Sequence, residues 1–121
     1  MDMPIPFPRY RQRIVARRGG EFVAIQAADA AYFHSDDKLT FLVANDGQRL
    51  LVDAPLAELE SALDPLEFFR LNRQFLARAA AIASFRPIGK GKLLVELNPP
   101  MRGEIIVSQE RAAGFRRWLE Q

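Results

Sequence analysis

The stretch FFRLNRQFLARAAAIASFRPIGKGK, residues 68–92 (the basic stretch), is the most informative part of the chain for both fold and function. It carries no acidic side chain and six basic ones: Arg70, Arg73, Arg78, Arg86, Lys90 and Lys92. The forty residues before it, 28–67, carry nine acidic and two basic side chains, which gives them a net charge of −7. The formal net charge of the whole chain is only +2, so the total hides this asymmetry. A concentrated basic segment beside an acidic one indicates an anionic partner.

Two kinds of side chain alternate within the basic stretch. The apolar ones would anchor it to a core: Phe68, Phe69, Leu71, Phe75, Leu76 and Ile82. The polar ones between them are Arg70, Asn72, Arg73, Gln74 and Arg78. Arginine matches guanine O6 and N7, and asparagine or glutamine matches adenine N6 and N7. Arginine also binds phosphate through paired hydrogen bonds. By this chemistry alone, a DNA-binding surface and a plain solvated face are equal alternatives.

Length and composition predict a single domain with a real core. The chain has 121 residues, of which 49% are apolar, including nine Phe and one Trp. The absence of cysteine excludes thiol chemistry, disulfides and cysteine-ligated zinc. Apolar runs are only a few residues long, so we expect no membrane segment, and the N-terminus lacks the pattern of a signal peptide. These features together predict a cytoplasmic protein.

Residues 1–12 are predicted to be a linker or extended N-terminal arm, followed by a domain at 13–121. Prolines alternate with apolar residues at Pro4, Pro6 and Pro8, a pattern that favours an extended segment. A basic cluster at Arg9, Arg11 and Arg13 follows. The arm is interpreted as a solvated connector, and the alternative is a basic arm that touches a nucleic-acid backbone.

The hydrophobic pattern predicts about seven short strands and two short helices. The strands lie at 13–18, 21–26, from 31 onward, 39–45, 48–53, 92–98 and 103–108. Asp29 should start a single helical turn. Gly19-Gly20 predicts one tight turn, and Asp46-Gly47 predicts a type I′ hairpin turn.

The first helix is expected near 55–63 with Asp53 as its N-cap, and the second at 109–119 with Ser108 as its cap. In the second helix Phe115 and Trp118 belong to one apolar stripe, which should pack on a sheet; a dimer surface is the alternative. Strands do not alternate with long helices, so the fold should be mainly β and antiparallel.

The sequence predicts no active site, no metal and no cofactor. The only histidine, His34, stands in a strand-like segment and is interpreted as a surface or hydrogen-bonded structural residue. The neighbouring pair Asp36-Asp37 forms a polar loop rather than a set of metal ligands. Residues 89–92, GKGK, lack the spacing of a phosphate-binding loop and indicate a basic hairpin tip. We therefore expect that the protein is not an enzyme.

The order of residues in the basic stretch resembles the LytTR family of bacterial DNA-binding domains, usually found at the C-terminus of two-component response regulators. Residues 68–85, FFRLNRQFLARAAAIASF, are similar to the family's run of aromatic, Arg, aliphatic, His/Asn, Arg, Ser and aromatic residues before a hydrophobic segment that ends in an isoleucine strand. Three further pieces follow the family's order: AAYFHSDDKLTFLVANDGQRLLVD (30–53), LAELESAL (56–63) and IIVSQERAAGFRRWL (105–119). The resemblance covers roughly residues 13–119.

The resemblance implies an elongated, mainly antiparallel β fold of small sheets with two short helices. It also implies a transcription regulator that reads successive major grooves of double-stranded DNA through loops and bends the duplex. Such domains commonly bind direct repeats as dimers. Their partner in the same polypeptide is commonly a receiver domain upstream.

By the same resemblance, the principal base-reading residue is Arg73, with Asn72 beside it. Arg70 starts the motif and is either a phosphate ligand or a structural residue. Arg78 replaces the small or amide residue often found at its position and could add a contact to the DNA backbone.

Two other loops should also reach DNA. Lys38 and Thr40 are the candidates in the first loop, although the aspartates beside them oppose close approach to phosphate. The other loop follows the Val-Ser pair, where an arginine is common in the family. Here the residues are Gln109 and Glu110, with Arg111 next, so the charge of the usual arginine is lost. Gln109, which can hydrogen-bond a base or phosphate, and Arg111 are the candidate contacts.

Two alternative functions come from other classes. The basic face could meet an acidic protein, which would make the domain an interaction or oligomerisation module. An RNA-binding β module is the third hypothesis, and the lack of paired exposed aromatics for base stacking argues against it.

Overall fold

A computed structural model describes residues 9–121 of the chain. Most of the predicted N-terminal arm, residues 1–8, therefore lies outside the described residues. The segment next to it is tied to the domain by two backbone hydrogen bonds. The amide of Arg11 donates to the carbonyl of Ala62 (2.8 Å), and the carbonyl of Gln12 accepts from the amide of Ala27 (2.8 Å).

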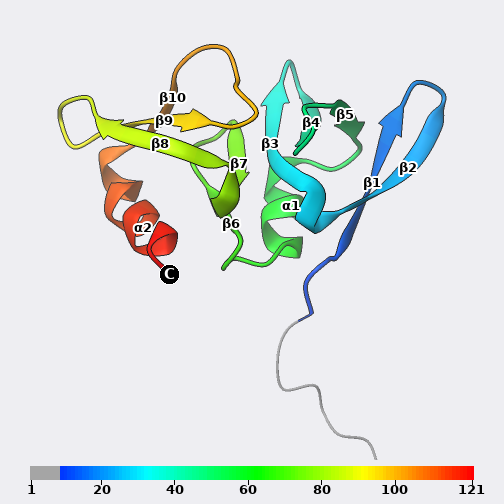
Figure 1. The fold of residues 1–121 in the computed structure, drawn as a ribbon, viewed down its shortest axis with the longest axis horizontal. Coiled ribbons are helices and arrows are strands. Elements are labelled where there is room, and N and C mark those ends of the chain that lie inside the picture. The colour runs from blue at the N-terminus through cyan, green and yellow to red at the C-terminus, as the bar shows by residue number, and fades with distance from the viewer. Residues whose placement is uncertain (1–8) are drawn as a thin grey trace, which may run out of the picture.

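The described part of the chain forms two antiparallel sheets and two α-helices (Figure 1). The larger sheet has the strand order β2-β1-β5-β4-β3-β7-β6. Its strands are β1 (Arg13–Arg18), β2 (Glu21–Gln26), β3 (Ala30–Asp36), β4 (Leu39–Ala44), β5 (Arg49–Val52), β6 (Phe68–Arg70) and β7 (Phe75–Arg78). The smaller sheet has the order β10-β9-β8, from β8 (Ile82–Pro87), β9 (Leu93–Leu97) and β10 (Ile105–Val107). The prediction of a mainly β, antiparallel fold is confirmed.

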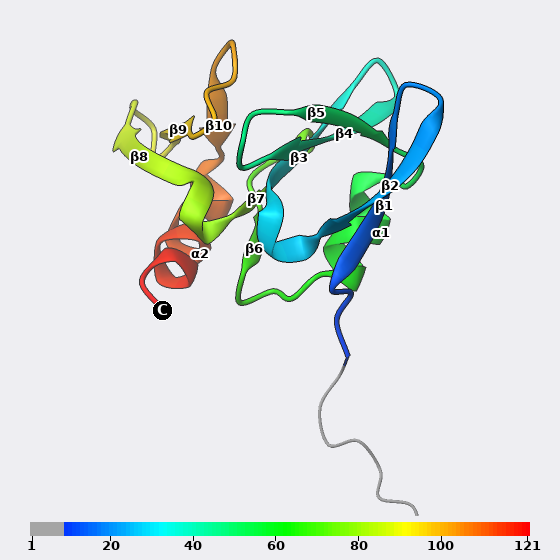
Figure 2. The ribbon, with the colours of Figure 1, turned by 45° about the vertical axis from the view of Figure 1, so that its right-hand side comes forward.

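The two helices are α1 (Leu56–Ala62) and α2 (Gln109–Leu119), and single 3-10 turns stand at Ala27–Asp29 and Ala79–Ala81. Figures 1 and 2 show α1 near the larger sheet and α2 near the smaller one, at the other end of an elongated molecule. No helix among residues 9–121 is long and apolar enough to cross a membrane.

The central strands are buried on both faces, which creates two cores. On one face Phe33, Leu42 and Leu76 pack with α1. On the other face Tyr32 and Phe75 pack with the smaller sheet and α2. Two-sided burial removes the polar face of a strand, and with it the alternating pattern that identifies a strand in sequence.

Three strands were missing from the prediction by hydrophobic pattern, and all three lie in the basic stretch; the family resemblance implied only the one that begins at Ile82. They are β6, β7 and β8. In β7, Phe75 and Ala77 belong to one core while Leu76 belongs to the other. The short apolar run therefore carries no period that distinguishes a strand from a helix.

The predicted type I′ turn at Asp46-Gly47 is wrong, although the β4–β5 hairpin itself is present. Of these two residues only Gly47 has a positive φ (92°). The Asp46 carboxylate accepts hydrogen bonds from the Gln48 amide (3.0 Å) and side chain (2.7 Å), which closes a longer loop. Two consecutive positive φ angles occur instead at Asp37 (51°) and Lys38 (68°), in the two-residue turn between β3 and β4.

The predicted helix positions hold, but the predicted caps do not. The residue before α1 is Pro55, and the Asp53 carboxylate pairs with Arg17 instead of capping the helix. Ser108 does precede α2, but its side chain makes no capping hydrogen bond. The first 3-10 turn ends at Asp29 rather than starting there. Phe115 and Trp118 are buried, which confirms that the apolar stripe of α2 packs inward.

His34 is a buried structural residue. Its ring stacks between Phe41 (centroids 5.4 Å apart) and Phe75 (5.7 Å). Its Nε2 accepts a hydrogen bond from Nε of Arg49 (3.3 Å). Burial of the imidazole, and then the Arg49 guanidinium, lower the pKa of His34, while the Asp36 carboxylate opposes them.

We expect the protein to lose stability as the pH falls from 7.5 to 5.5. The unfolded chain binds a proton at His34 near its ordinary pKa of about 6.5, whereas the folded protein binds it only at lower pH. Stability from this residue is therefore complete above the unfolded pKa and decreases below it. Urea unfolding at both pH values measures the effect. His34 is the only histidine, so a His34→Phe variant should have a nearly flat profile; an unchanged pH slope would contradict the prediction.

Candidate nucleic-acid interface

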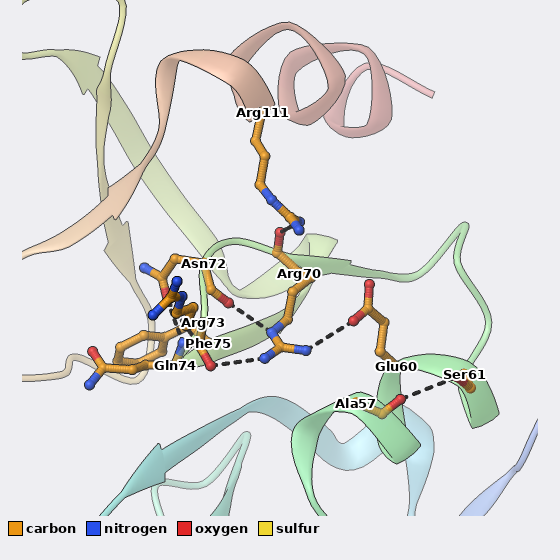
Figure 3. A network of polar contacts seen from close by, with 9 residues as sticks. All are labelled: Ala57, Glu60, Ser61, Arg70, Asn72, Arg73, Gln74, Phe75 and Arg111. Carbon is orange, nitrogen blue, oxygen red and sulfur yellow. Dashed lines mark hydrogen bonds and ion pairs between the residues drawn. The ribbon is translucent and has the colours of Figure 1, made fainter.

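The loop Asn72–Gln74 between β6 and β7 (the Arg73 loop) is held in place by the guanidinium of Arg70. Nε of Arg70 donates to the carbonyl of Asn72 (2.7 Å), and one terminal nitrogen donates to the carbonyl of Arg73 (2.9 Å). The other terminal nitrogen pairs with Glu60 of α1 (2.9 Å), as Figure 3 shows. Arg70 thus joins the loop to a helix, which is the structural alternative of the two that the sequence left open.

Asn72 fixes the same loop with its side-chain amide. Its Oδ1 accepts from the backbone amides of Gln74 (2.8 Å) and Phe75 (3.0 Å). Its Nδ2 donates to the carbonyl of Ile106 in β10 (3.0 Å). Both ends of the amide are therefore occupied, which opposes the predicted role of Asn72 in contacting bases.

Arg73 is exposed, and its guanidinium has no hydrogen-bonding or ionic partner within residues 9–121. Gln74, beside it, is exposed as well. The backbone under both residues is held from three sides, by Arg70, by Asn72 and by the amide of Ser35, which donates to the carbonyl of Gln74 (3.0 Å). The result is a free cation on a fixed loop.

Arg73 opens onto a groove of about 650 Å³ (the Arg73 groove). The groove is also lined by Lys92, Arg111 and Glu110, so it contains three cations besides Arg70 and one carboxylate. Arg111 points at the end of β6, where one of its terminal nitrogens donates to the carbonyl of Arg70 (2.9 Å; Figure 3). The groove suits an anionic ligand such as the DNA backbone.

Lys92 is the functional candidate that the sequence did not single out. It ends the β8–β9 hairpin tip, in which its amide donates to the carbonyl of Gly89 (3.1 Å). The tip rests on Gln109 at the start of α2, because a Cβ at Gly91 would lie only 2.6 Å from Cγ of Gln109. Gln109 therefore supports the hairpin. The one signal in the sequence was a positive charge at the first position of a predicted strand.

The second predicted loop is the turn between β3 and β4. Lys38 is exposed at its tip. Thr40 is only 7% exposed, so its side chain offers little surface for a contact, and its contact with DNA stays a prediction. Asp36, one of the aspartates near Lys38, pairs with Arg49 (3.6 Å), which offsets part of the local negative charge.

Strand register brings the predicted loops to one edge of the molecule. His34 in β3 lies opposite Phe75 in antiparallel β7, so the Arg73 loop and the β3–β4 turn lie beyond the same ends of these strands. In the smaller sheet, Val107 of β10 lies opposite Leu93 of β9, which places the hairpin tip beside the start of α2. The hydrogen bond from Asn72 to β10 connects the two sheets at this edge.

Arg78 does not lie with the other candidates, and the structure opposes its predicted contact with DNA. Its guanidinium donates to the carbonyls of Ala27 and Ala30 (3.1 Å for Ala30) and pairs with Glu67 (2.8 Å). It also lies 4.7 Å from the ring centre of Phe68. The side chain is 13% exposed and supports the fold.

The structural role of Asn72 predicts a loss of stability. We expect Asn72→Ala to lower the free energy of unfolding by about 1–2 kcal/mol, because two amides and one carbonyl lose their partner. Asn72→Asp should lose less, since it keeps the acceptor for both amides. Urea denaturation compares the two. An alanine variant that is fully stable yet fails to bind DNA would instead make Asn72 a base-reading residue.

Comparison with known proteins agrees with this geometry. A family model described as the LytTr DNA-binding domain matches residues 20–120. Among solved structures, the chain is similar to the LytTr DNA-binding domain of a Bacillus cereus protein described as a methyl-accepting/DNA response regulator. That match has a TM-score of 0.78 and 21% sequence identity, and it covers 92% of this chain and 99% of the other. The match confirms the fold, and the family model agrees with the expectation of a non-enzyme. The chain belongs to the LytTR family of DNA-binding domains.

Proposed function

We propose that this DNA-binding domain regulates transcription by placing the Arg73 loop in a major groove of its operator. The observation that carries the proposal is the contrast between Arg73 and its neighbours. Arg70 and Asn72 hold the loop by hydrogen bonds, and Arg73 alone presents a free guanidinium. A guanidinium on a fixed loop can donate two parallel hydrogen bonds to the O6 and N7 atoms of guanine.

The remaining exposed cations at this edge would contact the DNA backbone. Lys92 and Arg111 flank Arg73 in the same groove, and Lys38 stands on the separate β3–β4 turn. With Lys38 entering the next major groove, the duplex bends toward the protein edge. Two copies then occupy a direct repeat in the cytoplasm, downstream of a receiver or sensor domain of the response-regulator kind.

Selection of bound duplexes from a random pool tests this function. A recurring motif with a guanine that depends on Arg73 is expected, and the spacing between its repeats reports how two copies are arranged. Enrichment of no motif would contradict sequence-specific binding. Unchanged light scattering on addition of duplex would then favour the protein-interaction alternative.

Salt dependence separates backbone contacts from base contacts. Affinity should fall steeply with added salt, because each phosphate contact releases counterions. Lys92→Ala should weaken binding to all sequences alike and reduce the slope of log K against log salt by about 1. An unchanged slope would remove Lys92 from the set of phosphate contacts.

A further inference from the structure

Strand β2 is an open edge of the larger sheet. It pairs only with β1 among the described strands, through six regular pairs from Arg13↔Gln26 to Arg18↔Glu21, without a bulge. It contains one charged residue, Glu21, and neither lysine nor proline. Figure 1 shows it at the end of the molecule opposite the β8–β9 hairpin and α2.

Other sheet edges in the described part of the chain are protected. The edge strand β8 contains Arg86 and Pro87, and its pairing shifts register between Ile82 and Ser84. Strand β6, at the other edge of the larger sheet, and β10, at the other edge of the smaller sheet, are only three residues long. Charges, proline, bulges and short strands are the features that prevent edge-to-edge association. Strand β2 has a single terminal charge and none of the other features.

The outward face of the β1–β2 hairpin is exposed, and it carries three apolar side chains beside Arg13, Arg17 and Gln26. Phe22 is 67% exposed and Val15 is 61% exposed. Ala24, opposite Val15 in the pairing, is exposed too. On the inner face, Val23 and Ile25 are only partly buried against the first core. A strand added to β2 would therefore cover apolar side chains on both faces.

We propose that β2 pairs with β2 of a second copy of this chain, antiparallel and centred on Ala24. A two-fold axis perpendicular to the sheet keeps every side chain on its own face of the sheet. An odd-numbered residue can therefore face only an odd-numbered residue of the second copy, and an even-numbered residue only an even-numbered one. Centring on Ala24 places Ala24 opposite its own copy, Val23 opposite Ile25, and Phe22 opposite Gln26.

Charge favours this register over its neighbour. Centring on Val23 would place the Glu21 carboxylate opposite Ile25 of the second copy. Centring on Ala24 instead places Glu21 opposite Ala27, beyond the end of the strand. Within each copy, Arg17 lies over Phe22, with its guanidinium 5.9 Å from the ring centre. In the dimer, the Arg17 side chains of the two copies would therefore lie on either side of the paired β2 strands. The two edges are complementary to each other.

The pairing leaves the DNA-binding edge free. Tandem copies on a direct repeat face the same way and do not meet through a two-fold contact. The β2 contact therefore joins copies bound to separate DNA segments. This role on DNA rests on the proposed function, whereas the pairing itself does not.

Cross-linking of the full chain without DNA tests the pairing. The chain has no cysteine, so Ala24→Cys introduces a single thiol at the two-fold axis. Facing Cα atoms in antiparallel strands lie about 4.5–5.5 Å apart, within the range of a disulfide. With a mild oxidant added to accept the two electrons, we expect a disulfide-linked dimer to form about tenfold faster or more than in the matched variant Ala83→Cys, because pairing raises the effective thiol concentration. Ala83 is exposed on β8.

A second variant gives an independent result. Ala24→Lys places two like charges face to face, so a dimer of the wild type in light scattering should become a monomer, while Ala83→Lys remains dimeric. A wild type that is monomeric at its highest soluble concentration, together with equal cross-linking rates at Ala24→Cys and Ala83→Cys, would overturn the proposal. Because no DNA is present, that outcome leaves the test of operator binding untouched.

Discussion

Replacing Arg73 with alanine is expected to weaken binding to the selected operator by about 1–3 kcal/mol, roughly five- to 150-fold. This is the value of one good bidentate contact with a base. Little of it should come from loss of structure, because the guanidinium of Arg73 has no partner within residues 9–121. Anisotropy titration of a labelled operator at one fixed salt concentration measures the loss. The same titration with random duplex measures the non-specific part.

A matched variant separates contact from charge. Arg117→Ala removes the same charge from an exposed position in the last turn of α2. It should lower the affinity for operator and the affinity for random duplex slightly and equally, because it weakens the long-range electrostatic attraction between the protein and DNA. Arg73→Lys should keep random-duplex affinity but lose operator affinity, because an ammonium cannot make the planar double contact. If Arg73→Ala behaves like Arg117→Ala, Arg73 contributes charge alone and the assignment is wrong.

Local pattern was sufficient where a single face of an element is buried. Helix α2 follows from Ser108 and the apolar spacing that ends at Leu119, and the structure gives the same limits. The β1–β2 hairpin follows from Gly19-Gly20 between two strands. Pattern failed at β7, because Leu76 enters one core and Phe75 the other.

The candidate site was predictable to the level of the loop but not of the side chain. Arg70, Arg73 and Arg78 are chemically identical in sequence, and their roles differ only through partners elsewhere in the chain. Arg70 meets Glu60, ten residues earlier, and Arg78 meets Ala27, 51 residues earlier. A family pattern identifies which positions occur together. Only the fold determines which guanidinium remains free.

Arg78→Leu is expected to cost about 3 kcal/mol of stability, a large effect for a single substitution. The guanidinium donates hydrogen bonds to the backbone carbonyls of the buried residues Ala27 and Ala30. Each buried carbonyl left without a donor costs about 1–3 kcal/mol. The half-exposed pair with Glu67 adds at most about 1 kcal/mol. Urea unfolding followed by circular dichroism measures the loss, and Arg86→Leu, at an exposed position of β8, should change stability little.

Arg78→Lys distinguishes a structural arginine from one that contacts DNA. Lysine keeps the charge, but its single nitrogen cannot reach Ala27, Ala30 and Glu67 in the arrangement that the three guanidinium nitrogens occupy. The variant should therefore lose stability while the folded fraction binds operator as tightly as wild type. If Arg78 contacted phosphate instead, lysine would keep the stability and most of the affinity, and only the charge-removing variant Arg78→Leu would weaken binding by the folded fraction. The stability of Arg78→Lys and the affinity of folded Arg78→Leu together decide whether Arg78 supports the fold or contacts DNA.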